Sequence, residues 1–248
     1  MRSLPMLPAA RRVDPPARAA RGGAAAVAAC ACALAGVVAL GPSGAAHAAD
    51  AAVALPAPRL AGPVALEATL LQRRSLRAFA DDALTSAEVG QLLWAAQGLS
   101  DAEGRRTAPS AGARYPLELY LAAGRVQGLA PGLYRYRPQG HALEPLGAAD
   151  PRAAITAACA QPWVGDAPVL VLVAASTART AARYGARAER YVALEAGAAA
   201  QNLLLQAVAL GLGGTPVGAF DDAALRRALP LAADEQPLLV LPVGRPPR

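Results

Sequence analysis

The segment from Ala188 to Leu212 has the spacing of one long helix, and apolar side chains surround it instead of forming a single stripe. The larger apolar positions and the alanines between them are Val192, Leu194, Ala196, Ala200, Leu203, Leu204, Ala207 and Leu210. A helix that is apolar on most sides is stable in water only when neighbours cover it. The chain must therefore enclose this helix in a core or place it against a second subunit, and both alternatives stay open.

Shorter helical patterns and strand patterns lie before and after this helix in the sequence. Helical spacing or capping residues predict helices over 66–74, 86–97, 151–160 and 223–229, the second opened by a Thr85–Glu88 capping box and ended by Gly98, and the last capped by Asp221 or Asp222. Alternating or continuous apolar runs predict strands over 117–123, 132–138, 168–176 and 237–244. Helices and strands mix without regular alternation, which favours an α+β fold over a doubly wound sheet.

The N-terminal 48 residues have the pattern of a signal peptide. An Arg- and Pro-rich stretch precedes an apolar run over 22–40, and a small-x-small cleavage site follows at 46–48. An uncleaved signal anchor, a lipoprotein box at Cys30 and a twin-arginine signal at Arg11 and Arg12 are alternatives. We expect an exported, periplasmic protein with an Ala/Pro-rich linker over 49–65 and one folded domain over 66–248, without a membrane segment after cleavage.

The inventory of ionisable residues excludes several kinds of chemistry. All 24 basic residues are Arg, which leaves no Lys for a Schiff base or a P-loop. The net charge of +6 falls to +2 without the leader, which holds five Arg and one acid, so a nucleic-acid surface is not expected. Beyond the leader only Cys159 and His141 remain of their types, which argues against a disulfide, a Cys/His metal site and a Ser-His-Asp triad.

Three segments could bind a ligand. Arg73, Arg74, Ser75 and Arg77 place three guanidinium groups and a hydroxyl within five residues, a set suited to phosphate, although a solvated basic turn is the alternative for such a run. Residues 108–116 are turn-rich and small, and could lie against a flat ligand or form an ordinary loop. Residues 211–220 follow the long helix, where Gly213 and Gly214 could stop it.

In this order, the segments RRSLRAF, PSAGARYPLELY, GLYRYRP and RYGARAERYVALEAGAAAQNLLL resemble the nitroreductase family, and within it the SagB-type branch of thiazole/oxazole dehydrogenases. The resemblance extends over residues 66–245. It implies a nitroreductase-like α+β fold, with a central, mostly antiparallel sheet flanked by helices. It also implies a homodimer with the long helix at its interface and FMN in each of two interface clefts.

The resemblance also implies which residues bind FMN. Around the phosphate and ribityl chain they are Arg73, Arg74 (through its backbone), Ser75, Arg77 and, as a weaker candidate, Arg245. Around the flavin ring they are Pro109, Ser110, Ala111, Gly112 and Ala113 from the partner subunit, and Pro216, Val217 and Gly218 with their backbone amides near N5. Tyr184 is implied as a catalytic acid or hydrogen-bond donor, with a purely structural tyrosine as the alternative.

Three positions depart from the family pattern. Ala113 stands where many relatives have Asn, and Ala198 where they often have His. Arg183 stands before Tyr184 where azoline-oxidising members have Lys; a guanidinium stays protonated and cannot act as a general base. Three polar residues of the apolar helix also match the pattern, namely Glu195, Gln201 and Asn202. We interpret them as buried hydrogen-bonding groups, with direct contact to the cofactor as the alternative.

We therefore expect an FMN-dependent oxidoreductase that moves a hydride between a reductant and an organic acceptor such as a quinone, nitroaromatic or heterocycle. NAD(P)H is the expected co-substrate, but an exported enzyme would need another donor because nicotinamide cofactors are cytosolic. An exported, non-catalytic flavin-binding protein and an apo structural dimer are the alternatives.

Overall fold

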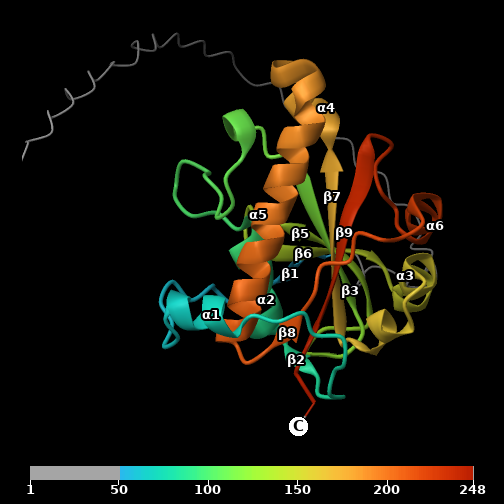
Figure 1. Cartoon of the computed structure of the whole chain (residues 1–248). Helices are drawn as coiled ribbons and strands as arrows, with labels where there is room; N and C mark the ends of the chain where they lie inside the picture. The colour runs from blue at the N-terminus through green and yellow to red at the C-terminus, as the bar shows by residue number, and fades with distance from the viewer. Residues whose placement is uncertain (1–50, 248) are drawn as a thin grey trace, which may run out of the picture. The chain divides into compact units, whose positions relative to one another are not determined.

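A computed structural model describes residues 51–247, so the predicted leader lies outside the described residues. Its centre is a seven-stranded sheet in which every pair of neighbouring strands is antiparallel (Figure 1). In spatial order the strands are β1 (Val53–Ala54), β6 (Ala142–Gly147), β5 (Gly132–Arg137), β3 (Leu117–Ala123), β7 (Val169–Ser176), β9 (Glu235–Gly244) and β8 (Gly213–Gly214). Two further short strands, β2 (Leu84–Thr85) and β4 (Val126–Gln127), pair with each other in parallel.

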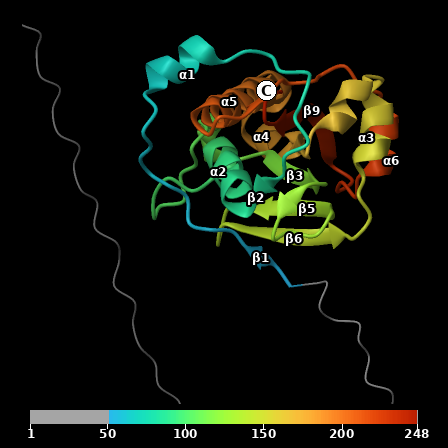
Figure 2. The ribbon, with the colours of Figure 1, turned by 90° about the horizontal axis from the view of Figure 1, so that it is seen from below.

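Helices cover both faces of the sheet, with α2 and α5 on one side and α3 and α6 on the other (Figures 1 and 2). The α-helices are α1 (Leu66–Gln72), α2 (Ser86–Gln97), α3 (Arg152–Cys159), α4 (Thr177–Tyr184), α5 (Ala188–Ala209) and α6 (Asp222–Ala228). The short 3₁₀ helices are η1 (Ala111–Ala113), η2 (Pro162–Asp166) and η3 (Gly185–Arg187). This arrangement confirms the predicted α+β class with a mostly antiparallel sheet flanked by helices.

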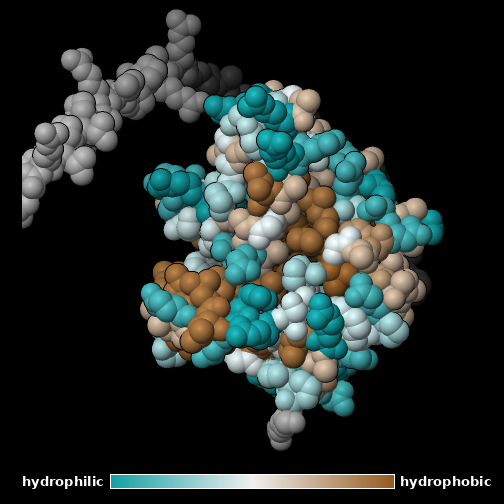
Figure 3. Space-filling model, viewed as in Figure 1, coloured by the Kyte–Doolittle hydropathy of each residue, from teal (hydrophilic) through white to brown (hydrophobic). Residues whose placement is uncertain are grey.

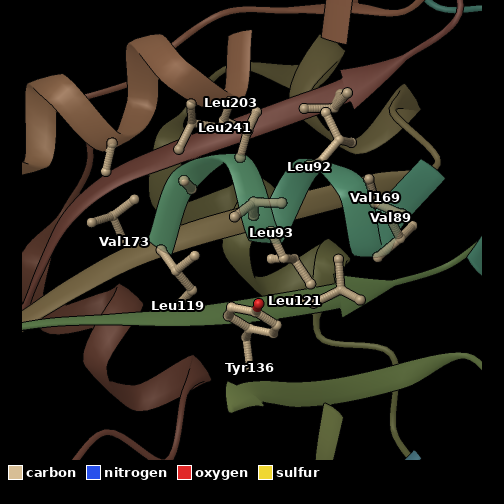
Figure 4. Close-up of a cluster of buried hydrophobic side chains, with 14 of the residues drawn as sticks. Val89, Leu92, Leu93, Leu119, Leu121, Tyr136, Val169, Val173, Leu203 and Leu241 are labelled. Atoms are coloured by element: carbon tan, nitrogen blue, oxygen red, sulfur yellow. The ribbon is translucent and has the colours of Figure 1, made fainter. Parts of the chain in front are cut away.

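The alternation of side chains along the central strands creates two cores. Leu119 and Leu121 of β3 point toward α2 and α5, where Leu92, Leu93 and Leu203 meet them (Figure 4). The intervening residues, including Tyr120 and Leu172, point toward α3 and α6. Every residue of β7 is buried, as its continuous apolar run predicts for a central strand covered on both faces.

The predicted helix ends agree with the structure where a cap marks them. The Thr85 side chain accepts the Glu88 amide while the Glu88 carboxylate accepts the Thr85 amide, so the capping box opens α2. Asp221 accepts the Ala224 amide and caps α6. The end of α5 differs from the prediction, because Gly211, with φ 70°, turns the chain out of the helix, and Gly213–Gly214 forms β8 instead of the helix stop.

The long helix is not enclosed within one chain. Leu194 on its outer face is 65% exposed, and Gly197 and Gln201 on the same face are exposed. The interpretation of Gln201 as a buried group is therefore wrong, whereas Asn202 donates from Nδ2 to the Thr107 carbonyl at 3.2 Å as expected. Hydrophobic residues gather over α1 and beside α5 on the face seen in Figure 3. The large exposed ones are Leu60, Val64, Leu66, Leu70, Leu71 and Leu194.

By length and composition alone, the helical stretch 177–209 is the one candidate membrane span among the residues that the structure describes. Core helices pass the same test. Here α5 packs its buried residues against α2 and the sheet.

The segment predicted as a linker lies against the domain. β1 pairs with the sheet edge at β6, and the backbone N–H and carbonyl of Arg59 both bond to the Gln91 side chain, at 2.8 and 3.1 Å. The fold therefore begins before Leu66. A two-residue edge strand has too little periodicity to be predicted from sequence.

Candidate functional site

The predicted phosphate-binding segment lies beside the short edge strand β8. Arg73 caps the C-terminus of α1, its amide donating to the Thr69 carbonyl at 2.9 Å. The chain then turns and runs parallel to β8, with a Ser75–Gly214 bridge and a Leu76 amide that donates to the Gly214 carbonyl at 3.2 Å. The sheet edge thereby fixes the backbone between Arg73 and Arg77.

This close approach depends on the absence of side chains at the two glycines of β8. A Cβ at Gly213 would lie 2.9 Å from the Leu76 side chain, and one at Gly214 would lie 2.4 Å from the Pro242 carbonyl oxygen. Both contacts are shorter than a Cβ tolerates, and the second is to backbone that cannot rotate away. The two glycines therefore allow the arginine segment to pack directly against the sheet edge.

The guanidinium groups in this segment have different surroundings. Arg74 donates from NH1 to the carbonyls of Leu71 and Arg73, both at 2.8 Å, so its side chain folds back onto the end of α1. The Arg77 guanidinium lies 5.8 Å from the Trp163 ring centroid. Among the described residues, neither Arg73 nor Arg77 forms an ion pair with a carboxylate. These two cations are therefore free to bind an anion.

Arg245 lies next to this segment but its side chain is engaged elsewhere. Its carbonyl accepts the Ala80 amide at 3.0 Å, which places the end of β9 beside the arginine segment. Its guanidinium donates to the Glu88 carboxylate at 2.7 Å. Burial works against the charge on Glu88, but hydrogen bonds from Thr85 and Arg245 outweigh it and lower the pKa of that carboxyl. Arg245 thus stabilises the start of α2.

The backbone of residues 216–218 limits which of these residues can donate an amide hydrogen bond to a ligand. Val217 exchanges both of its backbone hydrogen bonds with Val240, at 2.8 and 2.9 Å, and its side chain is buried. Pro216 has no N–H, and the Val217 N–H is occupied, so neither offers a free amide to a ligand. Pro216 and Gly218 are exposed on either side of it. Of the three predicted residues, Gly218 retains an available amide.

The loop Pro109–Ala113 lies against α4 and the N-terminal half of α5. A Cβ at Gly112 would lie 2.8 Å from the Tyr184 hydroxyl and 3.1 Å from Arg183 Cδ, so both side chains pack directly on this loop. The rings of Tyr184 and Tyr191 meet edge to face, with centroids 5.0 Å apart. The structure therefore brings Tyr184 together with the second predicted segment.

One chain keeps the two halves of the predicted site apart. The Pro109–Ala113 loop contacts α5 near Glu195, whereas β8, which carries the arginine segment, packs beside the C-terminal part of α5 with Gly214 next to Leu204 (Figure 1). Glu195 and Leu204 are nine helical residues apart, which corresponds to roughly 14 Å along α5. Within one subunit the phosphate-binding residues and the loop do not form a single pocket.

A family model described as the nitroreductase family matches residues 70–245 of this sequence. The chain belongs to the nitroreductase family. A Methanocaldococcus jannaschii protein that carries the name of a nitroreductase is 42% identical over 187 residues, covering 73% of this chain and 91% of its own.

Solved structures place this nitroreductase-family chain in the same fold. A crystal structure from Ralstonia eutropha, described as a nitroreductase, has a TM-score of 0.72 and 34% identity, and the match covers 86% of this chain and 97% of that one. The NADPH:FMN oxidoreductase of Vibrio harveyi, solved with NAD⁺, has a TM-score of 0.53 at 19% identity, covering 74% and 68% of the two chains. At 19% identity, the similarity to the Vibrio harveyi structure concerns the fold alone.

The residues of this nitroreductase-family protein fit an FMN phosphate. Two guanidiniums that have no carboxylate partner among residues 51–247, with a serine between them, are the donors that a phosphate monoester needs. Trp163, which contacts Arg77, belongs to the same region, and no feature of the sequence indicated it.

Glu195 has the most perturbed carboxyl among the described residues. Burial raises its pKa to about 7, and Ser110, Arg106 and the Ala111 amide oppose that shift only in part. The sequence indicated this residue through a carboxylate placed on an apolar helix, but not the loop that covers it. Arg106, which donates to Gln97 Oε1 at 2.8 Å, was not indicated by any motif.

Proposed function

We propose that this protein is an exported FMN-dependent oxidoreductase that acts as a homodimer. The observation that carries the proposal is the pair Arg73 and Arg77, whose guanidiniums have no carboxylate partner within residues 51–247 and whose backbone packs against Gly213 and Gly214. Membership of the nitroreductase family supports it, as does the likeness in fold to an enzyme named an NADPH:FMN oxidoreductase.

The arginine segment would bind the phosphate end of FMN. Arg73 and Arg77 donate charge-assisted hydrogen bonds to phosphate oxygens, and the Ser75 hydroxyl adds a neutral donor. Arg74 supports the segment through its bonds to the end of α1, and Arg245 keeps the adjacent start of α2 in place. Gly218 offers its amide toward the flavin ring.

Two copies of the chain would complete each site. The exposed face of α5 around Leu194 and the exposed leucines of α1 form an apolar surface that a second copy would cover. A two-fold interface of this kind would bring the Pro109–Ala113 loop of one subunit toward the arginine segment of the other. In this arrangement the loop would line the flavin across the interface.

FMN would supply the redox chemistry by accepting and donating a hydride. The protein then has to orient the two substrates in turn and exclude water, which requires few acid or base groups. Tyr184 can donate a hydrogen bond from its hydroxyl beside Gly112. A guanidinium is not a general base, so we propose a reductase or dehydrogenase without a general base at Arg183.

The donor and acceptor classes follow from the site and the leader. We propose NAD(P)H, or a non-nicotinamide donor after export, as the reductant, and a quinone, nitroaromatic or heterocycle as the acceptor. The finer assignment to the SagB-type branch rests on the sequence segments that resemble it.

An anaerobic absorbance experiment on residues 49–248 tests the function. The purified protein is loaded with FMN, then NADH or NADPH is added, followed by a quinone. Bleaching of the flavin band and its recovery are the expected result. A bound flavin that NADH, NADPH and dithionite do not reduce, or that quinone does not reoxidise, would indicate a binding protein. Failure to bind FMN would refute the site assignment.

A further inference from the structure

Glu195 is a buried carboxyl without a hydrogen-bond partner among residues 51–247. Its side chain belongs to the face of α5 that is turned into the protein, and the residue is 3% exposed. Neither carboxyl oxygen has a partner within that part of the chain. Buried polar groups nearly always form hydrogen bonds, so the surroundings of this carboxyl must explain why it forms none.

The Pro109–Ala113 loop covers Glu195. Pro109, Ser110 and Ala111 form one wall of a cavity of about 310 Å³, and Tyr191, Leu194 and Glu195 of α5 form the other. Ser110 Oγ accepts the Tyr115 amide at 2.8 Å, which leaves its own hydroxyl proton free. The Ser110 hydroxyl and the Ala111 amide are the neutral donors that face the carboxyl.

The same loop holds a conformation that its sequence disfavours. Gly112, Ala113 and Tyr115 have φ values of 60°, 52° and 47°, and two of these three residues carry a Cβ. Non-glycine residues keep left-handed φ values only where the surroundings impose them. The Ser110–Tyr115 bond, the Tyr184 hydroxyl against Gly112 and the surface of α5 beneath the loop are those surroundings.

We propose that Glu195 is a positioning residue whose uncharged carboxyl allows the Pro109–Ala113 loop to close over α5, and whose ionisation opens the loop. Burial under this loop disfavours the carboxylate more than its neighbours Ser110, Ala111 and Arg106 favour it, and neither carboxyl oxygen has a hydrogen-bond partner among residues 51–247. The charged form therefore favours a conformation in which the loop lifts and water reaches the carboxylate. Its effect on FMN rests on the proposed function; its effect on the loop does not.

The direction of the pH dependence follows from proton linkage. Burial raises the pKa of Glu195 to about 7 in the closed conformation, against an ordinary value of 4.5 for a hydrated Glu. The closed loop therefore binds the proton more tightly and is favoured at low pH, and closure weakens as the pH rises toward 7. Closure should fall about tenfold between pH 6 and pH 8.

Other charged and titratable groups surround the loop and contribute to the electrostatic environment of Glu195. They are Arg106 before the loop, Tyr115 after it, Arg179, Arg183 and Tyr184 of α4, and Tyr191 of α5. Among these groups Glu195 is the buried carboxyl that the loop covers.

Hydrogen exchange of residues 108–116 in the flavin-free protein tests the inference without depending on FMN. After correction for intrinsic exchange, wild-type protection should be about tenfold lower at pH 8 than at pH 6. In Glu195→Gln the protection should not depend on pH. Glu189→Gln, which removes an exposed carboxylate from the same helix, should behave as wild type. Protection that is constant in wild type, or pH dependence that persists in Glu195→Gln, would overturn the proposal.

Two further measurements complete the test. Direct titration of the Glu195 carboxyl by NMR in the wild-type protein needs no variant, and a pKa below 5 would overturn the proposal. The FMN phosphate titrates in the same way with both proteins, so the effect of Glu195 is read as the difference between them. With FMN present, the dissociation constant should therefore change with pH to a different extent in wild type and in Glu195→Gln. If no FMN binds at all, the proposed function fails while the exchange result still decides the role of Glu195.

Discussion

Neighbouring arginines in the phosphate-binding segment have different contacts, and those contacts decide which of them can bind a ligand. Arg74 is bonded to the end of α1, whereas Arg73 and Arg77 have no carboxylate partner within the described chain. The sequence predicted the cluster and its affinity for phosphate, but not this division. The direction of a side chain depends on where the helix ends and on which sheet edge lies next to it, and the spacing of residues does not contain that information.

Replacement of Arg77 by Ala should weaken FMN binding by about 10- to 100-fold, the effect of losing one charge-assisted hydrogen-bonding partner. Flavin fluorescence quenching measures the dissociation constant. Arg74→Ala is the matched control, because its guanidinium is bonded to backbone carbonyls, and it should change the constant less than threefold. Equal losses in both variants would mean that the cluster acts only through its net charge.

Glu195 gives a second prediction at this scale, on stability. A carboxyl with a raised pKa stabilises the fold below its unfolded value of 4.5, and that stabilisation is lost as the pH rises through the folded value of about 7. Glu195→Gln should therefore gain about 2 to 3 kcal/mol in unfolding free energy at pH 8 relative to its effect at pH 5. Urea unfolding at both pH values measures this. An equal effect at both would show that the wild-type carboxyl is not perturbed.

At the scale of elements, the sequence predicted most of the fold because caps and periodicity are local signals. The capping box of α2, the buried run of β7 and the Asp221 cap of α6 all lie where they were expected. The pairing of β8 with the arginine segment and the docking of residues 51–65 were not predicted. Both depend on contacts between segments far apart in the chain, and both involve strands too short to have a pattern.

The seating of the arginine segment on β8 gives a prediction for this element. Gly214→Ala places a Cβ 2.4 Å from the Pro242 carbonyl oxygen, so the backbone must shift. We expect a loss of about 2 kcal/mol in unfolding free energy and weaker FMN binding. Chemical denaturation and flavin titration measure the two effects. Gly62→Ala, where a Cβ meets nothing within 4 Å, is the control and should leave both unchanged.

At the scale of the whole molecule, the exposed outer face of α5 is the feature that one chain leaves unsatisfied. The sequence left open whether a core or a second subunit covers the helix, and one chain covers only part of it. The separation of the Pro109–Ala113 loop from the arginine segment along α5 points the same way. Sequence alone could not reveal this, because a helix that is apolar all round does not show which face the core uses.

Leu194→Arg should prevent dimerisation, because a two-fold interface would bring the added charges of both subunits into one apolar contact. The side chain is 65% exposed, so the monomer should remain folded. Sedimentation equilibrium and far-UV circular dichroism measure the two properties. Ala223→Arg on α6, on the other side of the sheet, is the control and should stay dimeric. A dimer that survives Leu194→Arg would place the interface elsewhere.

Sedimentation velocity of the FMN-loaded protein, recorded in both the protein band and the visible flavin band, tests the central claim most directly. We expect the flavin absorbance to sediment with a dimer at one FMN per subunit, and we expect Leu194→Arg to release the flavin together with the dimer contact. Flavin that sediments with a monomer, or that remains at the meniscus as free FMN, would contradict a flavin site built from two copies of this chain.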